Sequence, residues 1–247
     1  MRYLGGKSRA GKHIAKFLNG ALGGTRRFIE PFVGGFNIVP HVKTTGAIQC
    51  ADIKRPLVAM YQDLQHGWDP PQTVTKEEYA AAKSLPDTDP LKAFIGFGCS
   101  FGGKWFGGYA RGERLKSGAP RNYAANGRNS LIKALPHICR VGDFLAGDYR
   151  FLFTGAQDAV IYCDPPYANT TKYSTGAFDH VAFWAWCQDM ATNNDVFVSE
   201  YTCPVPHTVA LELTRDRSLN VNSDTITERL FKVHPRVANP NQLSLNL

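Results

Sequence analysis

The sequence lacks the cysteine spacing of a metal site or a disulfide framework. Its six cysteines stand at positions 50, 99, 139, 163, 187 and 203, and no two of them form a Cys-x-x-Cys pair. Cys203 and His207 have a spacing that suits a metal ion, but no second pair accompanies them, so we predict no metal site. The pattern favours free thiols in a reducing compartment, with Cys50, Cys139 and Cys163 packed as small hydrophobic side chains.

Long apolar runs are also absent. No stretch reaches the roughly 18 apolar residues that a membrane-spanning helix needs. The first residues include Arg2 and Lys7 but no apolar segment of the kind found in signal peptides. These absences predict a cytoplasmic protein that does not contact a membrane.

Two nucleotide-binding signatures are missing as well. The dinucleotide fingerprint Gly-x-Gly-x-x-Gly does not occur, which disfavours a cofactor with a pyrophosphate group. Gly5-Gly6-Lys7-Ser8 looks like the end of a phosphate-binding loop, but the first glycine of that motif would fall on Met1. We therefore exclude a nucleoside triphosphatase.

Residues 159–167, in contrast, carry a motif suited to an exocyclic amine. Residues 159–163 form an apolar run typical of a buried parallel strand, and the two prolines of Asp164-Pro165-Pro166-Tyr167 end it. Ligands of open α/β sheets bind just past the carboxyl ends of strands. There Asp164 and the carbonyl of Pro165 offer two acceptors, and Tyr167 offers an aromatic face. An ordinary turn that ends a strand is the alternative interpretation of this tetrapeptide.

Two earlier strands predict a nucleoside site. An apolar run from Phe28 leads into Gly34-Gly35, and a second run at 48–53 ends in an acid, Asp52, about 20 residues later. Glycines let the backbone approach a ligand closely, and a carboxylate at the next strand tip accepts hydrogen bonds from ribose hydroxyls. Asp52 would also suit a cap for the helix expected at 56–64. With Asp164 in the same sequence, the binding interpretation is preferred.

Positive charge is concentrated in the middle of the chain. The net charge is +7, and residues 104–133 hold seven basic residues against the single acid Glu113. Glycines and aromatic residues are interleaved at 101–109. Clustered positive charge attracts phosphates and aromatic side chains stack on bases, so we predict nucleic-acid contact here in preference to a solvated loop. The residues expected to make this contact are Lys104, Trp105, Tyr109, Arg111, Arg114, Lys116 and Arg121.

The remaining pattern divides the chain into two parts. Residues 1–64 and 136–247 carry the strand motifs and are predicted to form one catalytic domain, which an inserted, mainly helical domain at 65–135 interrupts. Helices are expected to start near Thr75 and Pro90. A helix at 181–192 is expected to turn Val181 and Trp184 toward the core. Further strands are predicted at His137–Val141, Asp195–Ser199 and Glu228–Val233.

Taken in order, these motifs resemble a known family. Tyr3-Leu4-Gly5-Gly6-Lys7, the residues at 30–35, Asp52-Ile53 and the tetrapeptide at 164–167 occur in the order and spacing of Dam-like (D12 class) DNA adenine-N6 methyltransferases. The resemblance extends from residue 2 to about residue 201. It implies an α/β fold with a Rossmann-like, S-adenosylmethionine-dependent methyltransferase sheet and an inserted target-recognition domain.

The resemblance also implies a set of cofactor contacts. S-adenosylmethionine would be the methyl donor, and Asp148-Tyr149 would lie beside its adenine ring, with Asp143-Phe144 as an alternative at nearly the same place. Lys7 would contact the cofactor or the DNA. The predicted cofactor residues are Tyr3, Lys7, Glu30, Pro31, Phe32, Gly34, Gly35, Asp52, Ile53, Asp148 and Tyr149.

The predicted catalytic residues are Asp164, Pro165, Pro166 and Tyr167. A base inside a duplex hides its amine, so such an enzyme flips the adenine into a pocket. Hydrogen bonds from N6 to the Asp164 carboxylate and the Pro165 carbonyl would free the nitrogen lone pair and stabilise the developing positive charge. Tyr167 would stack on the base. Tyr173 and Phe178 are candidates to line or cover this pocket; packed loop aromatics are the equal alternative.

Several alternatives stay open. Cytosine N4 would use the same acceptors, although the order of the motifs favours adenine. A catalytically silent DNA-binding protein on the same fold is the second alternative. The Arg-Gly-Glu-Phe-Asn-Val-Pro sequence of GATC readers is missing, which puts GATC specificity in doubt. We expect a monomer that acts on double-stranded DNA in a bacterial cell or a phage-infected host, with or without a companion restriction endonuclease.

Overall fold

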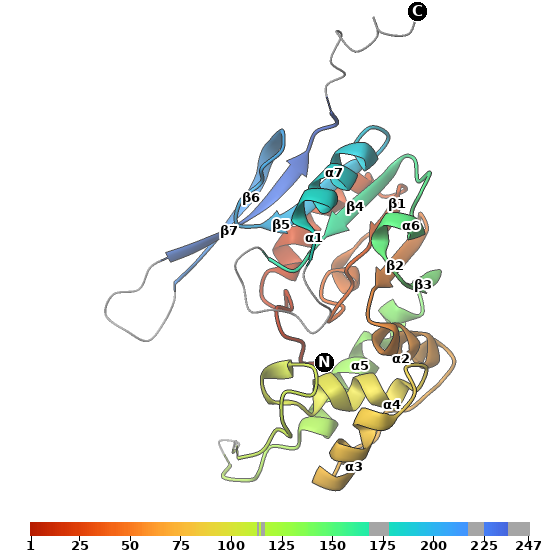
Figure 1. The fold of residues 1–247 in the computed structure, drawn as a ribbon, viewed down its shortest axis with the longest axis vertical. Helices are drawn as coiled ribbons and strands as arrows, with labels where there is room; N and C mark the ends of the chain where they lie inside the picture. Colours follow the sequence, from red (N-terminus) through yellow and green to blue (C-terminus); the bar gives the residue numbers. More distant parts are fainter. Residues whose placement is uncertain (113, 115–116, 168–177, 217–224, 237–247) are drawn as a thin grey trace, which may run out of the picture.

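A seven-stranded, mostly parallel sheet forms the centre of the protein (Figure 1). The structure is a computed structural model that describes residues 1–112, 114, 117–167, 178–216 and 225–236. The strand order is β3-β2-β1-β4-β5-β7-β6, and β7 runs antiparallel to both of its neighbours. The strands are β1 (Arg27–Glu30), β2 (Ile48–Asp52), β3 (Asp143–Ala146), β4 (Ala159–Cys163), β5 (Asp195–Glu200), β6 (His207–Asp216) and β7 (Thr225–Val233).

Apolar sequence explains why β4 and β5 lie in the middle of the sheet. Every residue of β4 is buried, and β5 is buried from its second residue onward. A strand covered on both faces needs such a continuous run, because both rows of side chains meet another layer. The strands predicted at 159–163 and 195–199 are therefore confirmed. Strands β1 to β5 are all parallel, so their carboxyl ends meet at one edge of the sheet.

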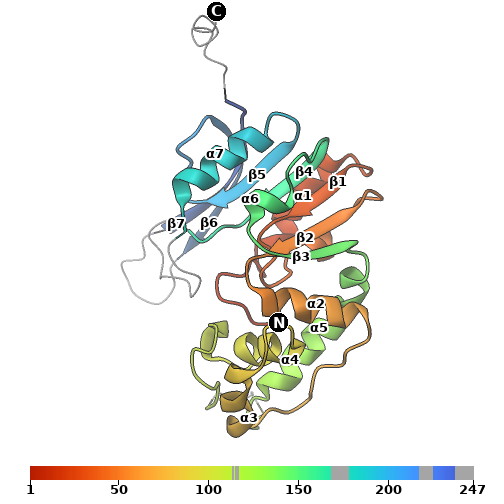
Figure 2. The ribbon, with the colours of Figure 1, turned by 45° about the vertical axis from the view of Figure 1, so that its right-hand side comes forward.

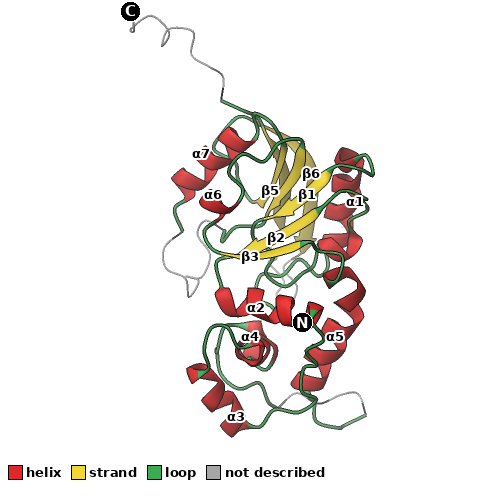
Figure 3. Ribbon diagram, turned by 90° about the vertical axis from the view of Figure 1, so that its right-hand side faces the viewer, coloured by secondary structure: helices red, strands yellow, loops and turns green. Residues whose placement is uncertain are grey.

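Helices cover both faces of this sheet (Figure 3). Helix α1 (Gly11–Leu22) lies on one face and shares a hydrophobic core with Phe28 of β1. Helices α6 (Tyr149–Leu152) and α7 (His180–Met190) lie on the other face, over Ile29. Adjacent residues of one strand thus point into opposite layers, as the pleat of a strand requires.

The connection between β2 and β3 is long and helical. Thr75 and Glu78 form the predicted capping box, in which each side chain accepts a hydrogen bond from the other residue's amide. Pro90 begins the next helix, as predicted. Side chains of this connection, such as Phe94, belong to the same core as α1. Its elements are α2 (Arg55–Gln65), α3 (Lys76–Ala81), η2 (Ala82–Ser84), α4 (Pro90–Ala93), η3 (Phe94–Gly98), η4 (Phe101–Gly103) and α5 (Tyr123–Ile138), while η1 (Val39–His41) follows β1.

The first residues of the chain lie between the sheet and these helices (Figure 2). The Leu4 amide donates to the carbonyl of Gly103 at 3.0 Å, and the Arg2 guanidinium lies 4.9 Å from the centre of the Tyr123 ring. Gly103 has φ +68°, and a Cβ there would lie 2.8 Å from the Tyr3 nitrogen. Only glycine allows the helical connection to approach the N-terminal segment this closely.

The strand predicted at His137–Val141 is wrong. These residues finish α5 and the turn after it, and the edge strand is β3, at Asp143–Ala146. Leu131, Ile138 and Val141 are buried at helical spacing, so a short apolar run that fitted a strand equally well belongs to a helix end. Cys139 is consequently exposed and not packed inside a strand.

Helix α7 is confirmed, but one side of it differs from the prediction. Trp184 is buried as expected, whereas Val181 is 83 % exposed. The buried side instead includes Phe183 and Cys187, because the helix begins at the Asp179 cap and turns its aromatic residues toward β4 and β5. Within the residues that the structure describes, no helix is both long and apolar enough to cross a membrane.

The buried hydroxyl of Tyr61 yields a test of how α2 supports the turn after β1. It donates to the carbonyl of Gly34 at 2.8 Å. Tyr61→Phe should lower the free energy of unfolding by about 1–3 kcal/mol, because a buried carbonyl loses its donor. Urea denaturation measures this. Tyr109→Phe, which removes a bond to the Val74 carbonyl from a less buried tyrosine, is the matched control and should cost less. Equal stability of Tyr61→Phe and the parent would show that the turn does not depend on this bond.

Candidate active site

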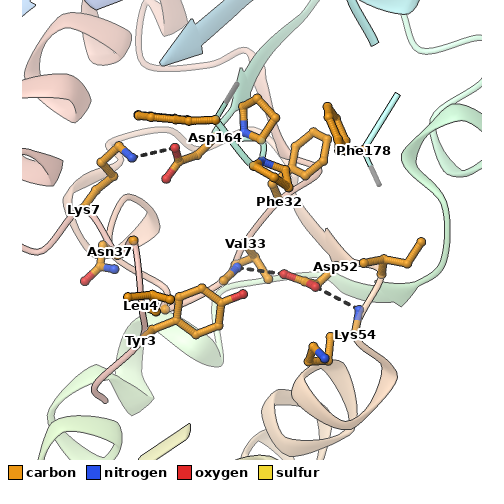
Figure 4. A pocket seen from close by; sticks show the side chains of 18 of the residues that line it. Tyr3, Leu4, Lys7, Phe32, Val33, Asn37, Asp52, Lys54, Asp164 and Phe178 are labelled. Atoms are coloured by element: carbon orange, nitrogen blue, oxygen red, sulfur yellow. Dashed lines mark hydrogen bonds and ion pairs between the residues drawn. The ribbon is translucent and has the colours of Figure 1, made fainter. Parts of the chain in front are cut away.

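A cavity of about 770 Å³ opens at the carboxyl ends of β1, β2 and β4 (Figure 4). Its walls come from the N-terminal segment, the turn after β1, the end of β2 and the loop after β4, with further residues from the helical connection. This is the edge of an open α/β sheet at which ligands bind. The predicted cofactor and catalytic residues meet here, except Pro31, which is buried outside the lining.

Asp52 joins the end of β2 to the turn after β1. Its Oδ2 accepts a hydrogen bond from the Gly34 amide at 3.1 Å, and its Oδ1 accepts one from the Lys54 amide at 2.9 Å. Burial raises the pKa of Asp52, and the two amide donors oppose that rise. The N-cap residue of α2 is Lys54, and no side chain caps this helix, so the interpretation of Asp52 as a helix cap is wrong. Asp52 lines the cavity, and its role in binding a nucleoside stays a prediction.

The turn after β1 requires glycine. Gly34 has φ +44°, and a Cβ at this position would lie 2.9 Å from the ring of Tyr3. A Cβ at Gly35 would meet the Tyr3 side chain at the same distance. The absence of side chains at the turn therefore lets Tyr3 pack directly against its backbone.

Glu30, the last residue of β1, places a buried carboxyl group in the cavity wall. It is 2 % exposed, and no described residue forms a hydrogen bond with its Oε2. Burial, reinforced by the negative charges of Asp164 and Asp52, raises the pKa of Glu30 well above its usual value. A buried carboxylate is costly unless it is protonated or paired with a cation. The cavity wall thus contains an acceptor suited to a positively charged ligand group.

Asp164 and Lys7 form a buried ion pair at the other side of the cavity (Figure 4). The Lys7 Nζ donates to Asp164 Oδ1 at 2.6 Å, and the two side chains are 7 % and 18 % exposed. Burial raises the pKa of Asp164, and Lys7 acts against that rise. Burial alone would lower the pKa of Lys7, but Asp164 and Glu228 together raise it. Lys7 therefore stays charged and lies beside the predicted catalytic residue Asp164.

Glu228 is a site residue that the sequence analysis did not identify. Its Oε1 accepts a hydrogen bond from the Tyr167 hydroxyl at 2.8 Å and lies 3.5 Å from the Lys7 Nζ. The ammonium of Lys7 also lies 4.5 Å from the centre of the Tyr167 ring. Burial raises the pKa of Tyr167 well above its usual value, and the neighbouring carboxylates add to that rise.

The reversed direction of β7 explains how Glu228 reaches this edge. Because β7 is antiparallel to β5, its early residues pair with the carboxyl end of β5, where Arg229 lies opposite Glu200. Glu228 thereby arrives beside the loop after β4. A signal for Glu228 was present in the sequence. Alternate residues of a strand face the same side, so Glu228 faces the same side as the buried Leu230, and an acid on a buried side of a strand is unusual.

Asp148-Tyr149 and not Asp143-Phe144 reaches the cavity. Both Asp148 and Tyr149 line it, and the Tyr149 ring packs 5.0 Å from that of Phe32. Phe144 is buried on the other side of β3, in the core beneath α2, and Asp143 is exposed at the start of the strand. Phe178 lines the cavity near Phe32, whereas position 173 lies outside the described residues.

Trp105 of the helical connection lies in the cavity wall. Its ring packs 4.8 Å from Phe97, and the Lys54 ammonium lies 4.4 Å from the Trp105 ring centre. Lys104 and Gly107 line the cavity beside it. Tyr109, in contrast, packs within the insertion, where its hydroxyl donates to the Val74 carbonyl at 2.7 Å. The structure thus places these two aromatic residues in different surroundings.

The other predicted DNA-contacting residues lie on the surface of the insertion. Lys104, Arg111, Arg114 and Arg121 are exposed, and Arg114 and Pro120 form an isolated antiparallel bridge. Position 116 lies outside the described residues. No described group of His, Cys, Asp or Glu side chains is arranged to hold a metal ion.

Comparison with known proteins agrees with the geometry of this edge. Residues 3–88 match the model of the family described as D12 class N6 adenine-specific DNA methyltransferase. The matched segment contains the N-terminal segment, the glycine turn and Asp52. A search of the curated proteins gives no significant match. The resemblance that the motifs predict, to the S-adenosylmethionine-dependent D12 class N6 adenine-specific DNA methyltransferases, is therefore confirmed over residues 3–88.

Proposed function

We propose that this protein transfers a methyl group from S-adenosylmethionine to adenine N6 of a base flipped out of double-stranded DNA. The observation that carries the proposal is the juxtaposition of the Asp164 motif with the cavity edge formed by the family-matched segment. The family implies S-adenosylmethionine as donor and double-stranded DNA as substrate. The roles of individual residues below are proposals.

The cavity has the groups that this cofactor needs. Asp52 offers its carboxylate toward ribose hydroxyls, and Gly34 and Tyr3 line the cavity beside it. Glu30 provides a buried acceptor for the α-ammonium group of the methionine part. Trp105 and Ile53 add apolar surface to the wall. The cofactor would supply an electrophilic methyl group bound to a sulfonium.

Asp164 would receive the target amine. The lone pair of adenine N6 is delocalised into the ring, and hydrogen bonds from its two protons to Asp164 and to the Pro165 carbonyl favour a pyramidal, nucleophilic nitrogen. The same acceptors stabilise the positive charge that develops on N6. Pro165 and Pro166 make this loop rigid, so the acceptors are already in place before the base arrives. Tyr167 would stack on the base.

The insertion would hold the DNA over the cavity. Its exposed basic residues attract phosphates, and Lys104 lies where the insertion meets the cavity. We propose residues 65–135 as the target-recognition domain on this basis. A recognition domain that borders the cofactor cavity places the duplex beside Asp164.

Asp164→Asn tests the acceptor. The variant keeps the size of the side chain but loses the negative charge, so kcat should fall about 10²–10³-fold while cofactor affinity stays near that of the parent. Methyl transfer from labelled S-adenosylmethionine to unmethylated DNA measures the rate. Nucleoside analysis of the product should show N6-methyladenine. If it shows N4-methylcytosine, the target base is cytosine and not adenine. Asp143→Asn is the control, because that carboxylate lies away from the cavity. A normal rate in Asp164→Asn would refute the mechanism.

Glu30→Gln tests the buried acceptor through pH. The raised pKa of Glu30 means that the folded, ligand-free protein keeps a proton that the unfolded chain loses first. The folded state is therefore favoured in acid, where Glu30 is protonated. This contribution to the free energy of unfolding is lost as the pH rises from the pKa of Glu30 in the unfolded chain toward its pKa in the folded protein. Glu30→Gln should therefore unfold at a higher temperature than the parent at neutral pH, and the difference should vanish in acid. Calorimetric melting over pH measures this.

The same substitution should weaken the binding of S-adenosylmethionine. A lost charge-assisted hydrogen bond costs about 1.5–3 kcal/mol, or roughly ten- to a hundredfold in affinity. Binding to the ammonium would ionise Glu30 and release its proton, so parent affinity should rise with pH more than the affinity of the variant does. Titration calorimetry measures both. Identical pH dependence in the two proteins would remove Glu30 from the cofactor site.

Salt dependence tests the insertion. Each neutralised phosphate contributes about −0.9 to the slope of log affinity against log salt. Replacing Arg111, Arg114 and Arg121 by Gln should flatten this slope by up to about 3 units, with cofactor binding unchanged. A triple variant of Lys12, Lys16 and Lys43, which are exposed outside the insertion, is the matched control. Fluorescence titrations of duplex DNA at several salt concentrations give the slopes. A parental slope in the insertion variant would mean that DNA binds elsewhere.

A further inference from the structure

Lys7 lies between two carboxylates, which makes the charge of this cluster unusual. Its Nζ is 2.6 Å from Asp164 Oδ1 and 3.5 Å from Glu228 Oε1, and all three side chains are less than one-fifth exposed. Two acids face one ammonium, so the cluster carries one negative charge more than Lys7 neutralises when both acids are ionised. A hydrogen bond from the Tyr167 hydroxyl to Glu228 ties the aromatic side chain to the same cluster.

The proposed reaction conflicts with this arrangement in one respect. Asp164 is expected to accept a hydrogen bond from the target amine, but one of its oxygens already accepts from Lys7. An ammonium bound to a carboxylate also cancels the negative charge that should stabilise the reacting nitrogen. If Asp164 and Lys7 were the only charged groups here, their charges would cancel, and the target base would meet a neutral ion pair and not a carboxylate.

We propose that Glu228 is a positioning residue that takes over the Lys7 ammonium when the target amine binds to Asp164. This inference rests on the proposed function. Glu228 already lies within ion-pair distance of Lys7, so a small movement of a flexible lysine side chain transfers the contact. Asp164 then keeps its charge for the amine, and Glu228 continues to accept from the Tyr167 hydroxyl.

The position of Glu228 suits this role. It lies on β7, where it pairs with Leu213 of β6 and comes directly before Arg229, the first residue of β7 paired with β5, so the carboxylate that receives Lys7 is held by the sheet. Lys7, by contrast, lies in the segment before α1 and has a long side chain that can shorten one contact as it lengthens the other. Tyr167 connects the two, because its ring faces the ammonium and its hydroxyl binds Glu228. A charge at position 228 therefore affects both the acceptor and the stacking residue.

Glu228→Gln tests the assignment through kinetics. The amide oxygen still accepts from the Tyr167 hydroxyl, so the loss is mainly one of charge. We expect kcat to fall at least about tenfold, while KM for S-adenosylmethionine changes by less than about threefold. Glu212→Gln is the matched control: Glu212 is an exposed acid on the neighbouring strand β6 that pairs with Arg229. A parental kcat in Glu228→Gln overturns the proposal.

The titration of Asp164 provides a readout independent of turnover. The titratable groups facing it are Lys7, Glu228, Glu30, Tyr162 and Tyr167. Burial is the main cause of the raised pKa of Asp164, and Glu228 adds to it. NMR of ¹³C-labelled aspartate carboxyls should therefore show a lower Asp164 midpoint in Glu228→Gln and an unchanged one in Glu212→Gln. The acid limb of the kcat profile should move to lower pH in parallel. An unmoved midpoint overturns the proposal.

The two readouts separate this inference from the proposed function. If the parent methylates no DNA, the proposed function fails, while the titration still decides whether Glu228 controls the charge of the cluster. If Glu228→Gln does not fold, Glu228→Asp serves instead, because it keeps the charge but shortens the reach to Lys7. That variant should retain the parental Asp164 midpoint with a reduced kcat. A parental kcat in it would also overturn the proposal.

Discussion

The buried Lys7–Asp164 ion pair is the interaction on which the arrangement of the site depends. Buried charges are tolerated only when they are paired, so the carboxylate at the end of β4 needs a cation nearby. The chain supplies that cation from a segment 157 residues away. The pair therefore holds the N-terminal segment against the carboxyl edge of the sheet. Removing Lys7 would leave the Asp164 carboxylate without its cation, whereas removing Asp164 would leave Lys7 with Glu228 as its partner.

The N-terminal segment at this edge also contacts the helical connection between β2 and β3. The Gly103 carbonyl of the connection accepts a hydrogen bond from the Leu4 amide, and Trp105 of the connection contacts Lys54, the N-cap residue of α2. The cavity and the basic surface of the insertion are thus joined by short contacts.

Local sequence predicted much of the cavity at the carboxyl edge of the sheet. The apolar run before Asp164 and the two prolines after it act on neighbouring residues, through burial and through backbone restriction, so they can be interpreted without tertiary information. The glycine turn and Asp52 were predicted for the same reason. Predictions failed where a local pattern suits two kinds of secondary structure. The short apolar run at 137–141 suits a strand or a helix end, and only its packing beside Leu131 decided between them.

The sequence by itself therefore determined the parallel strands β1, β2, β4 and β5, the glycine turn and the acids that follow it, because each depends on residues close together in the chain. Tertiary structure decided which charged and aromatic side chains from distant parts of the sequence come into contact. Glu228 is 61 residues from Tyr167 and lies beside it only because β7 runs antiparallel to β5. Trp105 faces Lys54, and Lys7 faces Asp164, for the same kind of reason. Contacts of this kind depend on strand direction and on the packing of the insertion, neither of which a local motif encodes.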